Sequence, residues 1–310
     1  MNYPWLESVD AEFKERLTAG RLPHALLLSG PRDTGKVELA TAFAAGLLCL
    51  ENQYPACGEC RSCQLLVSGA HPDCHVITFE EHPRTGVLRK ELVIDQVRKL
   101  ISSMQLTNTI SERKVALIHP VEAMNISTAN ALLKTLEEPP GEAALVLVSH
   151  DTARLPATIR SRCQNLQVRS PGFALALEWL CNDTGTERSE AEAALLAAAG
   201  SPLRARAMVL EGTTGQYRLV SSTLLDLRSG RSNPPGAMAA LAEVDPELLW
   251  SWISLLTAAE LKRVISDPDT AKQVSLLQSR ADSNRKFLSS PVRKDFLLQD
   301  WLIQWSRLRA

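Results

Sequence analysis

The first residues suited to chemistry form a glycine-rich loop, Gly-Pro-Arg-Asp-Thr-Gly-Lys-Val, at positions 30–37. The pattern G-x-x-x-x-G-K-[ST] cradles phosphate groups with backbone N–H donors and a lysine, and its last hydroxyl holds Mg²⁺. Gly30, Gly35 and Lys36 are in place, but Val37 stands where the hydroxyl is needed. The loop therefore predicts a degenerate nucleotide site. ATP or ADP can bind there, but the protein does not require either nucleotide.

A second chemical feature is a cluster of cysteines with two successive C-x-x-C steps. Four of the seven cysteines fall within 15 residues, at Cys49, Cys57, Cys60 and Cys63. Four thiolates close a tetrahedral, structural Zn²⁺ site without an open position, and we expect a zinc module over residues 49–74. An iron–sulfur cluster fits less well, because a ferredoxin-like run places its fourth cysteine three residues after the third. His71 is an alternative ligand, but we expect it in a turn.

The elements that position these residues alternate between strands and helices. Helical periodicity is expected over 36–48, around 92–104 and over 129–136, where Glu137-Glu138-Pro139-Pro140 ends the pattern. Buried strands are predicted at Ala25–Ser29, Cys74–Phe79, Val115–His119, Ala144–Ser149 and Asn165–Val168. This alternation predicts a parallel sheet with helices on both faces, within an α/β domain that spans residues 1–169.

Beyond Pro171 the strand signals disappear, and the chain becomes rich in helical patterns. Residues 170–210 are expected to form a small helical domain, with breaks at 182–185 and 200–202. A Gly/Ser/Pro-rich stretch at 229–236 interrupts the remainder, where tryptophan and leucine recur at helical spacing. We predict a second all-α domain over residues 211–310.

Composition narrows the possible partners. The net charge is −1, so the chain is not a general polycation for binding nucleic acid. No apolar run reaches the length of a membrane span, and no signal peptide is evident. We therefore expect a cytoplasmic protein that does not associate with a membrane.

Two further segments carry a family resemblance. Asn130-Ala-Leu-Leu-Lys-Thr-Leu-Glu-Glu-Pro-Pro140 and Thr158-Ile-Arg-Ser-Arg-Cys163, with the loop and the cysteines, strongly resemble bacterial clamp-loader subunits of DNA polymerase III. These belong to the AAA+ ATPase superfamily. The resemblance implies a RecA-like parallel sheet with an inserted zinc module, a small helical lid domain at 170–210, and a helical collar at 211–310 through which subunits oligomerise.

Within that family, this chain looks like the non-hydrolysing subunit that is often called the stator. His119 stands where the family's metal-associated aspartate ends a strand, and imidazole is a poor Mg²⁺ ligand. Glu122 lies three residues later, and we expect it to face elsewhere. With Val37, two metal-handling groups are lost. The resemblance thus implies weak or no ATPase and no intrinsic polymerase activity, although the chain serves a DNA-directed DNA polymerase holoenzyme.

The Ser-Arg-Cys segment implies that Arg162 is an arginine finger, offered in trans to ATP on a neighbouring subunit. Arg160 is its nearest competitor, since sequence cannot decide which side chain points outward. Arg204 resembles the family's second sensor, which contacts nucleotide in cis, although a solvated arginine fits equally well. Arg84 and Lys90 are candidates for DNA contacts. The simpler interpretation is that both are solvated surface charges.

The implied partners are motor subunits of the tau/gamma type and a delta-type subunit in a hetero-pentameric ring. Through that ring the chain would act on the sliding clamp and on primer–template DNA during replication. Two rival functions remain at this stage. One is an active AAA+ ATPase, a motor subunit or a helicase-like remodeler, with metal held through Asp33 or Thr34. The other is a zinc-dependent adaptor with no ring partner.

Overall fold

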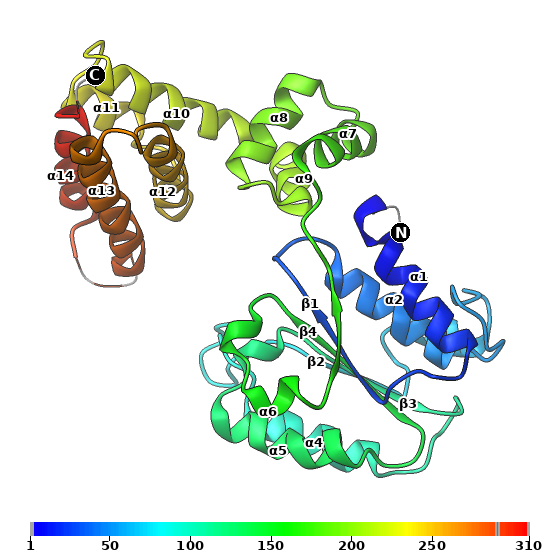
Figure 1. The fold of residues 1–310 in the computed structure, drawn as a ribbon. Coiled ribbons are helices and arrows are strands. Elements are labelled where there is room, and N and C mark those ends of the chain that lie inside the picture. Colours follow the sequence, from blue (N-terminus) through cyan, green and yellow to red (C-terminus); the bar gives the residue numbers. More distant parts are fainter. Residues whose placement is uncertain (1–2, 289, 291, 309–310) are drawn as a thin grey trace. The chain divides into compact units, whose positions relative to one another are not determined.

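The computed structural model describes residues 3–288, 290 and 292–308, which divide into two compact units, 1–171 and 172–310. The first unit is built on a five-stranded parallel sheet in the order β2-β3-β4-β1-β5 (Figure 1). All five predicted strands are present, but β2 and β5, at the edges of the sheet, are not the buried strands expected, since each buries one residue, Ile77 and Leu166. Their bounds are β1 Ala25–Ser29, β2 Cys74–Ile77, β3 Lys114–Ile118, β4 Ala143–Ser149 and β5 Gln164–Gln167.

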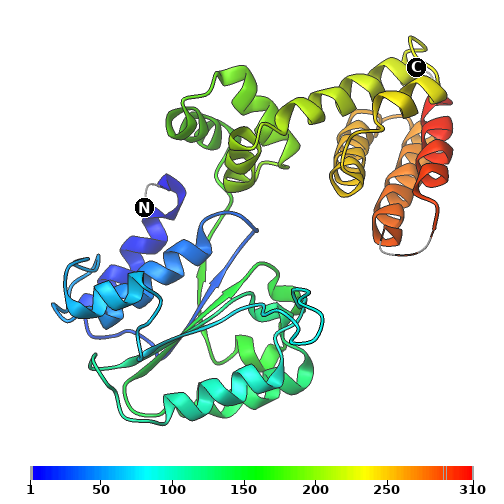
Figure 2. The same cartoon turned by 180° about the vertical axis from the view of Figure 1, so that it is seen from behind.

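Helices cover both faces of this sheet, as predicted from the alternating pattern (Figures 1 and 2). Successive strand residues point to opposite faces, so Leu26 and Leu28 join one core and Ala25 and Leu27 the other. The first core is covered by α1 (Glu7–Thr18) and α2 (Lys36–Leu48), and the second by α4 (Ile94–Met104), α5 (Ile126–Glu137) and α6 (Ala157–Arg160). Short elements complete the unit: η1 (Pro4–Leu6), α3 (Arg61–Val67), η2 (Val121–Ala123) and η3 (Thr152–Arg154).

The second unit is helical throughout the residues that the structure describes. The expected breaks separate α7 (Phe173–Thr184), α8 (Arg188–Ala197) and α9 (Pro202–Leu210), which pack on one another. The remaining helices are α10 (Thr214–Arg228), α11 (Pro234–Ala240), α12 (Pro246–Arg263), α13 (Pro268–Phe287) and α14 (Lys294–Ser306). Helix α10 packs against α8 and also against α11, α12 and α14. The further division into a lid and a collar stays a prediction.

Tryptophans form the core of the last helices. Trp250, Trp252 and Trp301 are fully buried, and the Trp301 indole N–H donates to the carbonyl of Leu277 at 3.0 Å. Burying so large an aromatic surface while satisfying the indole donor stabilises the packing of α12, α13 and α14. Among the described residues, no single helix is long and apolar enough to cross a membrane, and only the pair α8 and α9, bent by 119°, passes such a test jointly.

Candidate functional site

The phosphate loop lies at the carboxyl edge of the sheet. It joins β1 to α2, and β1 lies between β4 and β5. The chain leaves β1 toward one face and leaves β4 toward the other, since α2 packs in the first core and Leu155 and Ile159 in the second. Such a divergence opens a crevice at the strand ends, where α/β proteins bind ligands. The sequence pattern therefore lies in the context that phosphate binding requires.

Two glycines of this loop are required by geometry. A Cβ at Gly30 would lie 2.1 Å from the Val168 carbonyl oxygen, so a side chain cannot fit where β5 ends. Gly35 has φ +83° at the N-terminus of α2, and a Cβ there would meet the Tyr3 ring at 2.6 Å. The positive φ and the close approach both favour glycine. The backbone of the loop thus has a form that suits the cradling of a phosphate.

Lys36 is folded into its own loop. Its ammonium donates to the Pro31 carbonyl and lies 3.4 Å from the Thr34 hydroxyl oxygen, and the residue is only 2% exposed. Burial lowers the pKa of Lys36 to about 8, although the negative charge of Glu122 opposes this shift. The lysine remains mostly cationic at neutral pH and can still attract a phosphate.

The metal-handling positions lack ligands suited to Mg²⁺. Val37 packs against the apolar core beside α1 and α2. His119 directly follows β3, and its side chain lines a cavity of about 170 Å³ with Thr41 and Cys74. Burial lowers the pKa of His119, against a smaller opposite effect of Glu38, so the imidazole is neutral near pH 7.

Thr34, the candidate hydroxyl ligand of the rival ATPase, is fully buried. Its hydroxyl donates to the Pro31 carbonyl at 2.9 Å. The hydroxyl is therefore committed to the internal bonding of the loop. In this conformation Thr34 does not replace the missing side-chain oxygen at position 37.

The expectation that Glu122 faces elsewhere is wrong. Glu122 lies in η2 and is 6% exposed, and its Oε1 accepts the backbone N–H of His150 at 3.1 Å. Its charge acts on Lys36 across the strand ends. His150 follows β4 directly after Ser149, and burial, reinforced by the charge of Lys36, lowers its pKa. The sequence could not reveal this cluster because its three members come from different strand ends.

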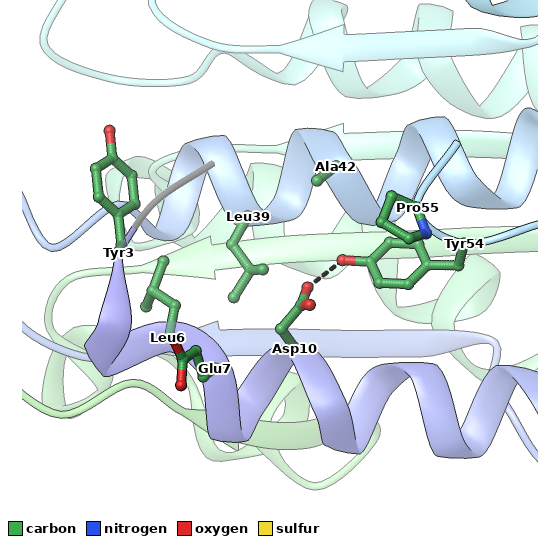
Figure 3. Close-up of a pocket in the computed structure, with 8 residues that line it drawn as sticks. All are labelled: Tyr3, Leu6, Glu7, Asp10, Leu39, Ala42, Tyr54 and Pro55. Atoms are coloured by element: carbon green, nitrogen blue, oxygen red, sulfur yellow. Dashed lines mark hydrogen bonds between the residues drawn. The ribbon is translucent and has the colours of Figure 1, made fainter. Parts of the chain in front are cut away.

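A cavity of about 170 Å³ lies between α1 and α2, beside the loop. Figure 3 shows Tyr3 and Leu6 at one end, Tyr54 and Pro55 at the other, and Leu39 between them. The Tyr54 hydroxyl donates to Asp10 and closes the far end. The Trp5 indole N–H donates to the Thr34 carbonyl at 2.8 Å. The N-terminal residues thus hold the phosphate loop on the side of α1.

The four predicted metal ligands are brought together. The sulfur atoms of Cys49, Cys57, Cys60 and Cys63 all lie within 4.8 Å of one another. The Cys57–Cys63 sulfur distance is 3.8 Å, and about 3.8 Å is the edge of a tetrahedron whose Zn–S bonds measure about 2.3 Å. Cys49 follows α2 and Cys60 caps α3, so two helix ends fix the group. The geometry fits a metal ion such as zinc.

The electrostatics of this cluster also favour a cation. Burial opposes ionisation of Cys60, but the backbone N–H groups of Cys63 and Leu50 outweigh it and lower its pKa to about 6. Burial and the neighbouring thiols raise the pKa of Cys63 to about 12. Four crowded thiols cannot all lose protons unless a cation neutralises them. A bound divalent metal would supply that charge.

His71 opens a turn, as expected, because its carbonyl accepts the Cys74 N–H at 3.2 Å, and it lies outside the four-cysteine cluster. It is buried, its Nε2 lies 2.9 Å from the Ser62 hydroxyl, and its Nδ1 accepts the backbone N–H of Asp73 at 3.1 Å. Ser62 in turn donates to the Leu48 carbonyl at 2.6 Å. Burial lowers the pKa of His71, in keeping with a neutral ring. This network ties α3 and the cysteine cluster to the end of α2.

Asp73 anchors the other side of the network. Its fully buried carboxylate accepts backbone N–H bonds from Thr109, Ile110 and Ser111 at 2.7–3.0 Å. Burial opposes ionisation, but these donors outweigh it and lower the pKa of Asp73 below its usual 3.8. The carboxylate therefore fixes the segment that leads into β3.

Replacing Asp73 by asparagine should lower the free energy of unfolding by about 2 kcal/mol at pH 7, because three charge-assisted bonds weaken. Urea unfolding measures this difference. Since the folded-state pKa is depressed, the difference should be complete above pH 3.8 and disappear as pH falls through the lowered pKa.

Asp95→Asn is the control for this variant, because the Asp95 side chain is mostly exposed, at 78%. Loss of so exposed a charge should change the free energy of unfolding by less than about 0.5 kcal/mol. Equal effects of the two variants would contradict the anchoring role of Asp73.

The candidate arginines lie at different places. Arg162 follows α6 and forms an ion pair with Glu137. Arg160 is exposed and makes no ion pair with any described residue. Arg204 is exposed on α9 in the second unit. Arg84 and Lys90 are exposed in the segment after β2. The roles assigned to these side chains from the sequence stay predictions.

Comparison with known proteins identifies the family. The profile of the family described as DNA polymerase III, delta subunit, matches residues 6–172. The chain is 36% identical to DNA polymerase III subunit delta' of Pseudomonas aeruginosa, over 97% of this chain and 89% of that protein. It is 32% identical to the subunit of the same name from Escherichia coli, over 84% of this chain and 76% of that one.

A solved structure shares the fold. A DNA polymerase III gamma subunit-related protein of Thermotoga maritima superposes with a TM-score of 0.50 at 17% identity, over 98% of this chain and 100% of that one. The sequence similarity to the delta' subunits extends over both units of the chain. On this ground, the chain belongs to the family of DNA polymerase III delta-prime subunits.

Proposed function

We propose that this chain is the stator of a clamp loader, a subunit that completes a ring and does not hydrolyse ATP. Its partners would be motor subunits of the tau/gamma type and a delta-type subunit in a hetero-pentamer. Together they would open the sliding clamp and place it on primed DNA in the cytoplasm. The collar at 211–310 would supply the ring contacts, with a small lid domain at 170–210 before it.

The observation that carries this proposal is the loss of both metal-handling groups at an otherwise well-formed phosphate loop. Val37 offers only an apolar side chain that packs against the core, and His119 presents a neutral imidazole where a carboxylate is needed. Phosphoryl transfer depends on Mg²⁺ to neutralise charge on the β- and γ-phosphates. Without that metal, Lys36 and the loop can hold phosphate, but they do not promote its transfer.

The second part of the proposal is that Arg162 acts on a neighbour's nucleotide. A guanidinium is permanently charged and offers several donors in a plane, which suits the charge that develops on a transferred phosphoryl group. Arg162 is 32% exposed and carries N–H groups that no described residue uses. Arg160 is the competing candidate, because it is also exposed and ends α6, two residues before Arg162.

The structural metal in this proposal is Zn²⁺, held by the four cysteines. The zinc module lies after α2, and the cavity wall formed by Tyr54 and Pro55 joins it to α1. Zinc would therefore support the helix that carries the phosphate loop, and it would take no part in chemistry because its four positions are filled.

An ATPase assay separates the stator from its rivals. We expect the purified chain to hydrolyse ATP no faster than its Lys36→Ala variant. Adding the chain to motor and delta-type subunits with clamp and primed DNA should stimulate ATP turnover. Robust turnover by the chain alone, lost in Lys36→Ala, would establish an active ATPase instead. Failure both to enter the complex and to stimulate it would favour a separate zinc-dependent adaptor.

A further inference from the structure

We propose that Glu137 is a positioning residue for Arg162, an inference that rests on the proposed finger role. The Arg162 Nε–H donates to Glu137 Oε1 at 2.7 Å, and Nη2 forms an ion pair with the same oxygen. The Nη1 group donates to the Thr158 carbonyl at 2.9 Å. A carboxylate and a backbone carbonyl thus fix the orientation of the guanidinium.

The remaining donors determine what this arrangement can do. A guanidinium has five N–H groups, and these contacts use one each on Nε, Nη1 and Nη2. One N–H on each terminal nitrogen is left without a partner among the residues that the structure describes. The side chain is held along its Nε edge, while two donors stay available to an anion. Two parallel donors suit two oxygens of one phosphate.

Glu137 is carried by a rigid element. It is the last residue of α5, and the preceding turn contributes Leu132 and Leu136 to the core with almost no exposure. Arg162 reaches it on the sheet's second face, 25 residues later in the chain. The core thus holds the backbone from which the Glu137 carboxylate meets Arg162.

The ion pair is better suited to orientation than to stability. The side chains of Glu137 and Arg162 are 49% and 32% exposed. Ion pairs this open to water contribute little to folding. A free arginine side chain samples many rotamers, and phosphate binding would have to restrict them. Glu137 imposes that restriction before the neighbour's nucleotide arrives, which lowers the cost of reaching the transition state.

Glu137 has an alternative role with the opposite consequence. A carboxylate can also hold an arginine in an inactive ion pair, here called parking, until a phosphate competes for the guanidinium. Parking would occupy the donors that the phosphate needs, whereas here the anchored edge is the one that contains Nε. Positioning predicts that loss of Glu137 lowers turnover, and parking predicts that it raises turnover.

The test uses the reconstituted complex of this chain with motor subunits, delta-type subunit, clamp and primed DNA. Glu137→Ala should lower the maximal rate of ATP turnover by about 10-fold and leave KM for ATP unchanged, because the motor subunit binds the nucleotide. Glu137→Gln, which keeps one acceptor oxygen, should lose less. Glu138→Gln removes the adjacent exposed carboxylate and should match the native rate.

Non-additivity distinguishes positioning from a general structural effect. The double variant Glu137→Ala/Arg162→Ala should be no slower than Arg162→Ala alone. The inference would be overturned if the double variant lost turnover by the product of the two single-variant losses. It would also be overturned if Glu137→Ala had a higher rate than the native protein. A loss in Arg162→Ala with a native rate in Glu137→Ala would refute the positioning role but keep the finger. A native rate in Arg162→Ala would refute the finger and the inference together. Size-exclusion chromatography checks that each variant assembles.

Discussion

Replacing Arg162 by alanine should lower ATP turnover at the neighbouring motor site by about 10³-fold or more. The loss is large because the guanidinium would meet charge that exists mainly in the transition state, in a site from which water is excluded. Binding of ATP to the motor subunit should change little. DNA-stimulated turnover of the reconstituted complex measures the effect, and single-turnover kinetics assign it to the adjacent site.

Two variants control this experiment. Arg160→Ala removes an exposed arginine at the end of α6, two residues before Arg162, and should leave turnover close to native. Arg162→Lys keeps the charge but loses the planar set of donors, so it should recover only part of the rate. If Arg160→Ala causes the large loss and Arg162→Ala does not, the finger is Arg160. If neither variant lowers turnover, the chain supports the ring without supplying an arginine finger.

The second large effect is expected on removal of the metal. The purified chain should contain about one zinc, and Cys60→Ser should lose it and loosen the segment around α3. Structural zinc in zinc-finger peptides contributes about 10–16 kcal/mol of apparent binding free energy, and a short segment has little core to compensate. Metal analysis, limited proteolysis and thermal unfolding would report the loss.

Cys181→Ser is the matched control for the zinc site. Cys181 lies on α7, outside the four-cysteine cluster, so its loss should alter neither the metal content nor the proteolytic pattern near α3. A native protein free of metal would contradict the zinc assignment. Loss of zinc in Cys60→Ser with an unchanged proteolytic pattern would show that the metal does not hold the segment together.

Much of the fold follows from local patterns. Strands β1, β3 and β4 are recognisable from short, largely apolar runs that are fully buried, and α2, α4 and α5 from 3.6-residue periodicity. The signal for β5 is weaker, because Gln-Asn-Leu-Gln buries only Leu166. Helix α13 is not predictable in this way, because its sequence is rich in polar residues and only a narrow stripe, Val274, Leu277 and Ala281, is buried. Its stability comes from packing against α12 and α14, which a local pattern does not report.

The candidate site divides in the same way. The phosphate loop and the cysteine cluster are predictable because their members lie close together in the sequence and their spacing alone limits the chemistry. The expectation for Glu122 is wrong, since its direction depends on how η2 packs against β4. The turn expected at His71 is present, but its burial and its hydrogen bond to Ser62 depend on how α3 packs against the end of α2.

Residue types and short spacings are sufficient to predict the phosphate loop, the missing hydroxyl at Val37, the four cysteines and the five strands. The strand order β2-β3-β4-β1-β5, the approach of Glu122 and His150 to Lys36, and the pairing of Glu137 with Arg162 emerge only in the folded chain. The contacts of Glu122 with His150 and of Glu137 with Arg162 join segments 28 and 25 residues apart. Such contacts arise from the packing of the two cores around the sheet, and no local preference encodes them.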